Sequence, residues 1–202
     1  PQPSLGQAAA GEAKRARELR RRLEQFQSRR SIEGVGLAWE HLGNDDPWIR
    51  HAARVALENQ ALEQWKLPAL TESNTKKALS ALMALARSSD PKVQSQIFGR
   101  LNDLPWEGLP MQWQLVALRT YQLAFTRMGG GRPGDRNPII KKIVTASEKS
   151  AEVRMEVSRL LIYLKAPGII PGLLNYVVDA ASPEERLFYL FHMRHIGDGW
   201  TP

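Results

Sequence analysis

The sequence repeats a two-residue signal for the start of a helix at nearly constant spacing. In each copy a short polar residue precedes a proline, and successive copies lie 44, 47 and 45 residues apart. Asp, Asn and Ser side chains accept hydrogen bonds from the first free amides of a helix, and proline fits the first helical position because no donor is needed there. We therefore predict that a helix begins at each copy. The copies are Asp46-Pro47, Asp90-Pro91, Asn137-Pro138 and Ser182-Pro183.

The segment that follows Asp46 has the residue pattern of a repeat helix. One face of the predicted helix is apolar and rich in alanine, which permits close packing against other helices. Segment 46–57 resembles the second helix of a HEAT repeat, whose usual signature is an aspartate, a β-branched residue, an arginine, then alanines and a leucine. Segments 90–101 and 150–161 keep this skeleton, and the spacing of the start signals is the period of HEAT and armadillo arrays. Because 150–161 is out of step with Asn137, the repeat boundaries stay open.

We predict an all-α fold, a HEAT- or armadillo-like α-solenoid (an α-α superhelix) with about five helix pairs behind an N-terminal helix. Residues 1–30 form a basic N-terminal helix or cap, and residues 31–202 form the HEAT-like repeat domain, within one structural domain overall. Residues 129–134 are rich in glycine and predict an exposed loop. The predicted helices are 8–29, 31–42 with 46–59, 61–70 with 73–88, 91–103 with 110–128, 137–147 with 151–165, and 169–180 with 183–196.

The net charge of +7 is concentrated near the start of the chain. The first 30 residues hold eight basic and three acidic residues, whereas the rest holds 20 basic and 18 acidic residues. A surface that follows a phosphate backbone needs Lys and Arg on successive structural units, and the body of the chain lacks that pattern. We therefore interpret the basic face of the first helix as a solvated outer face. Its partner-binding candidates are Arg20, Arg21 and Arg22.

The sequence contains few residues that could carry chemistry. The absence of cysteine excludes thiol nucleophiles and thiolate metal ligands, and His192 and His195 lack a third ligand nearby. The glycines of 129–134 are not followed by the Lys-Ser or Lys-Thr of a phosphate-binding loop, and no Gly-x-Ser-x-Gly motif occurs. We predict that the chain is not an enzyme and has no catalytic, metal-binding or cofactor-binding residues.

Six tryptophans stand in the sequence, and we expect most of them to be core residues. Trp48, in the first turn of its predicted helix, and Trp106, in the connection 104–110, are the two most expected at a surface. Exposed tryptophan is typical of binding hot spots, so both are partner-binding candidates.

Most of the chain, from about residue 15 to 201, is similar to the HEAT-like region of one group of large exported bacterial proteins. Those proteins join a sorbosone-dehydrogenase-like β-propeller, helical repeats and a C-terminal c-type cytochrome domain. The resemblance implies a scaffold or protein-interaction module, cut from a longer protein, in the periplasm or cell envelope. Its partners would be another protein or the neighbouring domains, which would carry any haem. The segments that carry the resemblance are 48–60, Trp65, 81–87, 121–127, 160–167 and 195–201.

The alternative is a HEAT-like solenoid that binds nucleic acid, including the alkylated-DNA glycosylases, which this chain resembles in size, basicity and tryptophan content. Those enzymes need a basic concave groove with a convergent aspartate and aromatic residues, and no such set is identifiable here. A third alternative is a solenoid that binds a small molecule in its concave face. No apolar run is long enough to span a bilayer, so we expect a soluble chain without membrane insertion.

Overall fold

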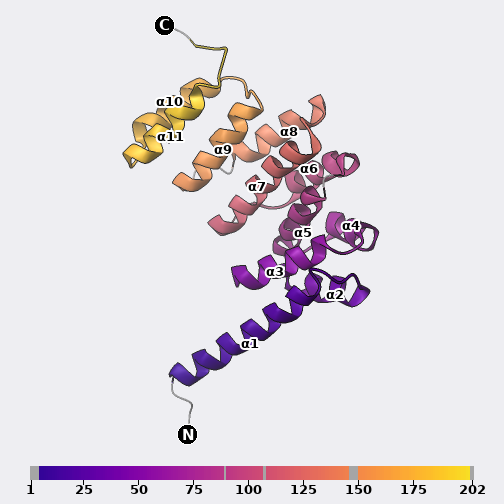
Figure 1. Cartoon of the computed structure of the whole chain (residues 1–202). Coiled ribbons are helices and arrows are strands. Elements are labelled where there is room, and N and C mark those ends of the chain that lie inside the picture. Colours follow the sequence, from indigo (N-terminus) through magenta and orange to yellow (C-terminus); the bar gives the residue numbers. More distant parts are fainter. Residues whose placement is uncertain (1–4, 89, 107, 146–149, 201–202) are drawn as a thin grey trace. The chain divides into compact units, whose positions relative to one another are not determined.

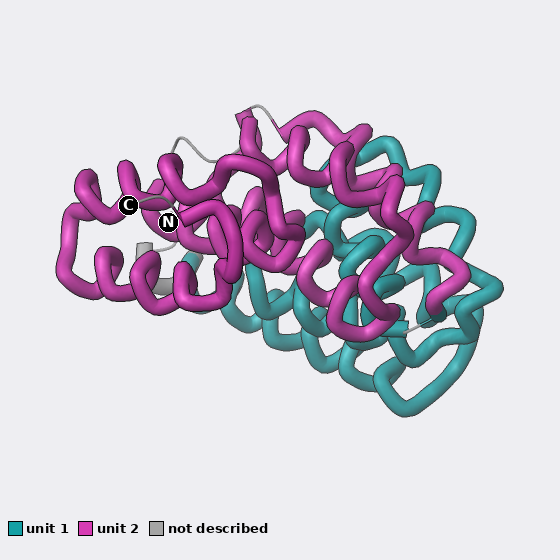
Figure 2. The backbone as a smooth tube through the Cα atoms, turned by 90° about the horizontal axis from the view of Figure 1, so that it is seen from above, with its two compact units in different colours: residues 1–90 teal, residues 91–202 magenta. Residues whose placement is uncertain are grey.

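The structure is a computed structural model that describes residues 5–88, 90–106, 108–145 and 150–200. Within these residues, all regular secondary structure is helical (Figure 1). The predicted all-α class is therefore confirmed. The chain divides into two units, residues 1–90 and 91–202 (Figure 2). Among the described residues, none of the helices is both long enough and apolar enough to cross a membrane.

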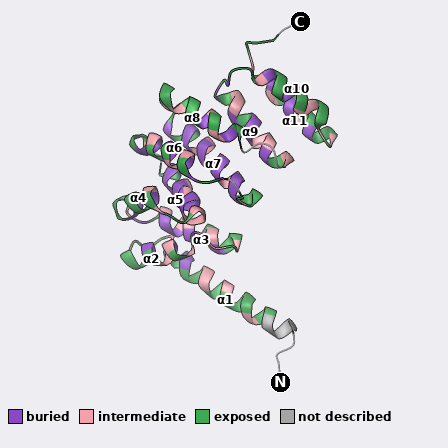
Figure 3. Ribbon diagram, turned by 180° about the vertical axis from the view of Figure 1, so that it is seen from behind, coloured by how far each residue is buried: buried purple, intermediate pink, exposed green. Residues whose placement is uncertain are grey.

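The first unit is organised around its third helix. Helix α3 packs against α1, α2 and α5, while α4 packs against α5 and α2. Buried residues lie where these helices meet, and the early turns of α1 are more exposed (Figure 3). The helices of this unit are α1 (Leu5–Gln25), α2 (Ile32–His41), α3 (Pro47–Glu58), α4 (Leu62–Thr71) and α5 (Thr75–Arg87).

In the second unit, α7, α9 and α11 lie side by side (Figure 1). Helix α7 packs against α9, α9 packs against α11, and the intervening α6, α8 and α10 pack against α7, α9 and α11 respectively. The elements are the 3-10 helix η1 (Pro91–Val93), α6 (Gln94–Asp103), α7 (Met111–Met128), α8 (Pro133–Val144), α9 (Ala151–Tyr163), α10 (Ile169–Asp179) and α11 (Pro183–Met193).

Two of the four predicted helix starts are confirmed with the expected caps. The Oδ1 atom of Asp46 accepts a hydrogen bond from the Trp48 amide at 2.8 Å at the start of α3. The hydroxyl of Ser182 accepts one from the Glu185 amide at 3.1 Å at the start of α11. A third start differs, because Pro91 begins the short η1 and α6 starts only at Gln94.

The start predicted at Asn137-Pro138 is wrong, because both residues lie inside α8. That helix begins earlier, at Pro133, where the Asp135 carboxylate accepts a hydrogen bond from the Arg132 amide at 3.0 Å. Pro138 therefore lies inside α8, because the capping interaction between Arg132 and Asp135 starts the helix before Asn137 is reached. The glycine-rich loop is consequently shorter than predicted, since Pro133 and Gly134 belong to α8.

The N-terminal helix is packed onto the first unit rather than separate from it. Leu23 and Phe26 are buried, and α1 contacts α3. The buried Gln60 holds the connection between α1 and α2, because its Nε2 atom donates to the Phe26 carbonyl at 2.9 Å and its Oε1 atom accepts from the Ser31 amide at 2.8 Å. The end of α1 is thus fixed by apolar burial together with buried hydrogen bonds.

Candidate functional site

Trp48, one of the two tryptophan candidates, lies at the surface. It occupies the first turn of α3, and 69% of the residue is exposed. This confirms the predicted exposure. Its role in binding a partner stays a prediction.

Trp106, the other tryptophan candidate, is buried, with 5% of the residue exposed. The expectation of a surface site there is wrong. The indole Nε1 atom donates to the Leu101 carbonyl at 3.2 Å, and the ring lies 6.1 Å from that of Tyr121, measured between centroids. The connection after α6 folds back because its tryptophan finds both an acceptor and an aromatic neighbour there.

The three arginine candidates share α1, the helix that contacts α3, where Trp48 stands. Arg20 is half-buried and its Nε atom lies 3.1 Å from Glu24 Oε1, whereas Arg21 and Arg22 are exposed. Exposed pairs of this kind contribute little to stability. Because their side chains are exposed, Arg21 and Arg22 are available to a partner, and Trp106 belongs to the second unit.

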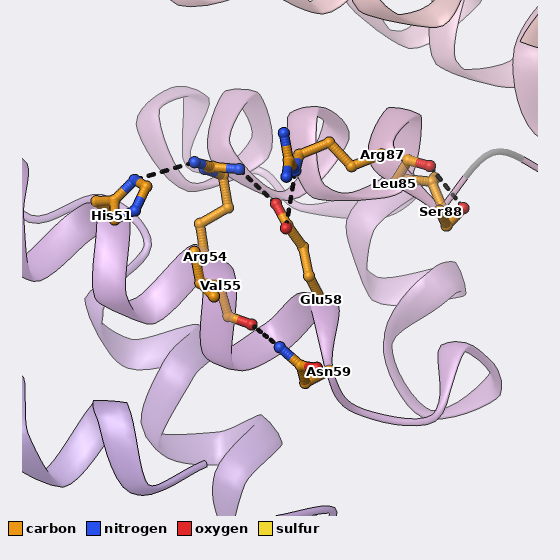
Figure 4. A network of polar contacts seen from close by, with 8 residues as sticks. All are labelled: His51, Arg54, Val55, Glu58, Asn59, Leu85, Arg87 and Ser88. Carbon is orange, nitrogen blue, oxygen red and sulfur yellow. Dashed lines mark hydrogen bonds and ion pairs between the residues drawn. The ribbon is translucent and has the colours of Figure 1, made fainter. Parts of the chain in front are cut away.

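A polar network joins α3 to α5 (Figure 4). The Glu58 carboxylate, largely buried, accepts hydrogen bonds from Arg54 and, at 2.8 Å, from Nε of Arg87. Arg54 lies 3.1 Å from Nδ1 of His51, whose pKa is lowered by partial desolvation and by the Arg54 charge. A neutral His51 can accept a hydrogen bond from Arg54, and the Glu58 carboxylate, shared by Arg54 and Arg87, holds α3 and α5 together.

The second unit has a surface groove between two neighbouring helices, which we call the α7–α9 groove. It encloses about 240 Å³. Phe125 and Leu160 are buried at its walls, and Tyr163 is 53% exposed with its ring centre 5.2 Å from that of Phe125. The groove therefore offers apolar and aromatic contact to something outside the described chain. Its lining residues are Gln122, Phe125 and Thr126 of α7 and Arg159, Leu160 and Tyr163 of α9.

Two arginines and one glutamate set the charge beside the α7–α9 groove. The Glu156 carboxylate is 13% exposed; it accepts from Gln122 Nε2 at 2.6 Å and from Arg159 Nη1 at 3.1 Å. Arg119 is 65% exposed, and its Nη2 atom lies 3.9 Å from the same carboxylate. Since one carboxylate faces two guanidinium groups, the cluster keeps one net positive charge.

Arginine–aromatic contacts continue this surface onto α11. The guanidinium carbon of Arg159 lies 5.2 Å from the ring centre of Phe188, and that of Arg194 lies 3.7 Å from the ring centre of Phe191. Both distances lie within the reach of a cation–π interaction. Aromatic and arginine side chains are enriched at binding hot spots, so this composition is typical of a binding surface.

A second hollow of about 500 Å³ lies where the connections after α9 and α11 meet. Its walls are mostly isoleucine and proline side chains, and Lys165, His195 and Asp198 are its ionisable members. Lys165 has a left-handed backbone, with a φ of 53°. Both signs of charge are present, so the lining favours no single ligand chemistry.

The α7–α9 groove was not predicted from the sequence, although the spacing of its lining residues was a usable signal. Arg159 and Tyr163 are four residues apart and so share a face of α9, as Gln122 and Thr126 share a face of α7. The spacing does not show that these two faces meet. That depends on contacts between residues far apart in the chain, such as Gln122 and Glu156, which are 34 residues apart.

No group of three or more His, Cys, Asp or Glu side chains in the described ranges is placed to hold a metal ion. Comparison of the chain with protein-family models, with curated proteins and with solved structures finds no match.

Proposed function

We propose that this chain is a HEAT-like helical-repeat scaffold that binds protein and has no catalytic step of its own. The observation that carries the binding role is the α7–α9 groove, where an exposed tyrosine and arginines surround a hollow with apolar walls. Trp, Tyr and Arg are the residues that dominate binding energy at protein interfaces, above all beside pockets that exclude water.

The helix packing supports the repeat part of the proposal. Helices α7, α9 and α11 contact one another in succession, and each is covered by the helix that precedes it in the chain. Within the first unit, α3 and α5 pair in the same way, with α2 on α3 and α4 on α5. Stacked helix pairs produce this alternation. The starts of α3, α5, α7, α9 and α11 lie 28 to 40 residues apart, so the spacing of 44–47 residues between the sequence signals is not the spacing of these pairs.

Exposed apolar side chains on α10 and α11 support a protein partner. Five large hydrophobic residues of these two helices are between 44% and 77% exposed. Helices α10 and α11 pack against each other, and large apolar side chains exposed on neighbouring helices are typical of a surface that another protein covers. The residues are Leu174, Val178, Leu187, Leu190 and Phe191.

The proposal also includes the wider setting that the sequence resemblance implies. In that setting the chain is part of a larger exported protein in the periplasm or cell envelope, and it holds neighbouring domains or binds another envelope protein. Any haem or dehydrogenase chemistry would then belong to those neighbouring domains. The resemblance is the support for this setting.

The test is a selection of random peptides displayed on phage against the immobilised chain, beside a titration with labelled duplex DNA. The proposal predicts an enriched peptide family that binds the chain, and DNA binding that is weak and disappears between roughly 50 and 200 mM salt. It is overturned when no peptide family is enriched, or when duplex DNA binds tightly at the higher salt. Replacing Arg20, Arg21 and Arg22 by alanine shows whether any residual DNA binding comes from α1 alone.

A further inference from the structure

We propose that the α7–α9 groove binds an acidic linear segment of a partner protein. One apolar side chain of the segment enters the hollow, and carboxylates beside it pair with Arg119 and Arg159. This inference rests on the protein-binding role proposed above and specifies the chemistry of the partner.

The size of the hollow favours a single side chain over a whole small molecule. Pockets that bury small molecules usually start at about 300 Å³, above the 240 Å³ found here. The walls suit an apolar group, because Phe125 and Leu160 are buried and the exposed ring of Tyr163 stands at the rim. An aromatic or branched aliphatic side chain that entered would remove its own surface and part of the Tyr163 ring from water.

The charges beside the α7–α9 groove select the residues that flank the apolar side chain of the bound segment. Glu156 already accepts hydrogen bonds from Gln122 and Arg159, so the second guanidinium group, that of Arg119, is held only loosely at 3.9 Å. An incoming carboxylate can pair with Arg119 without breaking either shorter contact. An incoming ammonium group would instead meet two arginines, so basic segments are disfavoured.

The arginine on α9 is ordered before a partner arrives. Its guanidinium group lies over the Phe188 ring and also donates to Glu156, so two neighbours fix its position. Arginine that is already oriented loses less conformational freedom when it binds a carboxylate. Arg159 is 43% exposed and therefore still accessible.

The same surface is a poor path for a nucleic-acid backbone. Glu156 lies between the two arginines, and Glu152 stands one turn earlier on α9, exposed in its first turn. A phosphate chain that followed α9 would meet both carboxylates, whereas a peptide can place its acidic side chains selectively at the arginines.

Fluorescence anisotropy with a defined probe tests the inference. The probe is a fluorescein-labelled peptide in which two acidic residues stand on each side of one phenylalanine. One companion peptide has serine in place of the phenylalanine, and a second has amides in place of all four carboxylates. The acidic, phenylalanine-containing probe should bind most tightly, and each companion should lose about tenfold in affinity.

Two charge reversals in the chain provide the matched comparison. Arg119→Glu should weaken probe binding about tenfold, whereas Arg136→Glu on the exposed face of α8 should change it less than about twofold, although both alter net charge equally. Tyr163→Ala, which removes the ring at the rim, should also weaken binding about tenfold. A thermal melt of each variant shows that it is folded.

Four outcomes overturn the inference: equal weakening by Arg119→Glu and Arg136→Glu, equal binding of the probe and its companions, no binding at about 1 mM peptide, or an oligonucleotide of matched charge that binds more tightly in an Arg119-dependent way. The proposed function is judged separately. When phage selection gives binding peptides that Arg119→Glu and Tyr163→Ala do not affect, only the inference about this groove fails. When selection gives no peptide at all, both fail.

Discussion

The guanidinium group of Arg159 lies over the ring of Phe188, with 5.2 Å between the guanidinium carbon and the ring centre. The contact connects α9 to α11 and fixes an arginine at the edge of the α7–α9 groove. Since Arg159 also donates to Glu156, one side chain links the packing of two helices to the charge of the proposed binding surface.

Replacing Phe188 by leucine should weaken binding of the acidic probe without unfolding the chain. Leucine keeps apolar contact but removes the π face, and such a cation–π interaction contributes about 0.5–1 kcal/mol. We expect a loss of about two- to fivefold in affinity, measured by anisotropy. Unchanged affinity would show that Arg159 does not depend on Phe188 for its position.

Gly34→Ala should destabilise the first unit and loosen α1. A Cβ atom at Gly34 would lie 2.7 Å from Cδ1 of Phe26, closer than carbon atoms approach, so the ring that anchors the end of α1 must move. We expect a cost of about 1–3 kcal/mol in the free energy of unfolding and faster proteolysis within α1.

Gly36→Ala on the same helix is the control. No atom lies within 4 Å of its Cβ position, so the gain in helix propensity should stabilise the chain by up to about 1 kcal/mol. Equal effects of the two substitutions in a urea titration would contradict the packing of Phe26 on α2.

Glu58→Gln should destabilise the connection between α3 and α5. Its carboxylate accepts from both Arg54 and Arg87, and a neutral amide beside two guanidinium groups loses charge-assisted hydrogen bonds in a largely buried place. We expect a loss of about 2 kcal/mol in the free energy of unfolding. The same change at the exposed Glu63 of α4 should stay within about 0.5 kcal/mol, and a similar small effect at Glu58 would refute the structural role of the network.

Glu185 should make stability fall in acid. The hydrogen bond from Arg154 holds the pKa of the Glu185 carboxyl below its ordinary value of 4.5, with further hydrogen bonds from the Ala181 amide and Tyr189. A carboxyl whose pKa is lower in the folded chain stabilises it above the unfolded-state pKa, and that contribution is lost as pH falls through the lowered value. Urea midpoints measured from about pH 7 to pH 3 should therefore drop more for the wild-type chain than for Glu185→Gln. Parallel curves for the two proteins would show that the Glu185 carboxyl does not contribute to the pH dependence of stability.

Local signals predicted the helices well, because caps and apolar faces act over a few residues. Asp46 and Ser182 both cap as their sequence positions indicate. Asn137 failed as a cap because Asp135 closes an earlier start, and the two signals differ only in which one the surrounding packing favours.

The candidate site was predictable only in part. Trp48 is exposed, as expected for a residue at a helix start, but the burial of Trp106 depends on the neighbouring Tyr121, 15 residues further along the chain. The α7–α9 groove requires Phe125 and Tyr163 to meet across a helix pair, which no local pattern specifies. Pairing of distant faces is decided by packing of the whole unit.

An NMR titration of the isotopically labelled chain with the acidic probe peptide shows which residues the peptide contacts. If the peptide binds in the α7–α9 groove, the amide signals of Gln122, Thr126, Arg159 and Tyr163 will shift, and the signals from Trp48 and α1 will stay unchanged. Shifts confined to α1, or spread evenly over exposed basic residues, would contradict a protein-binding groove between α7 and α9.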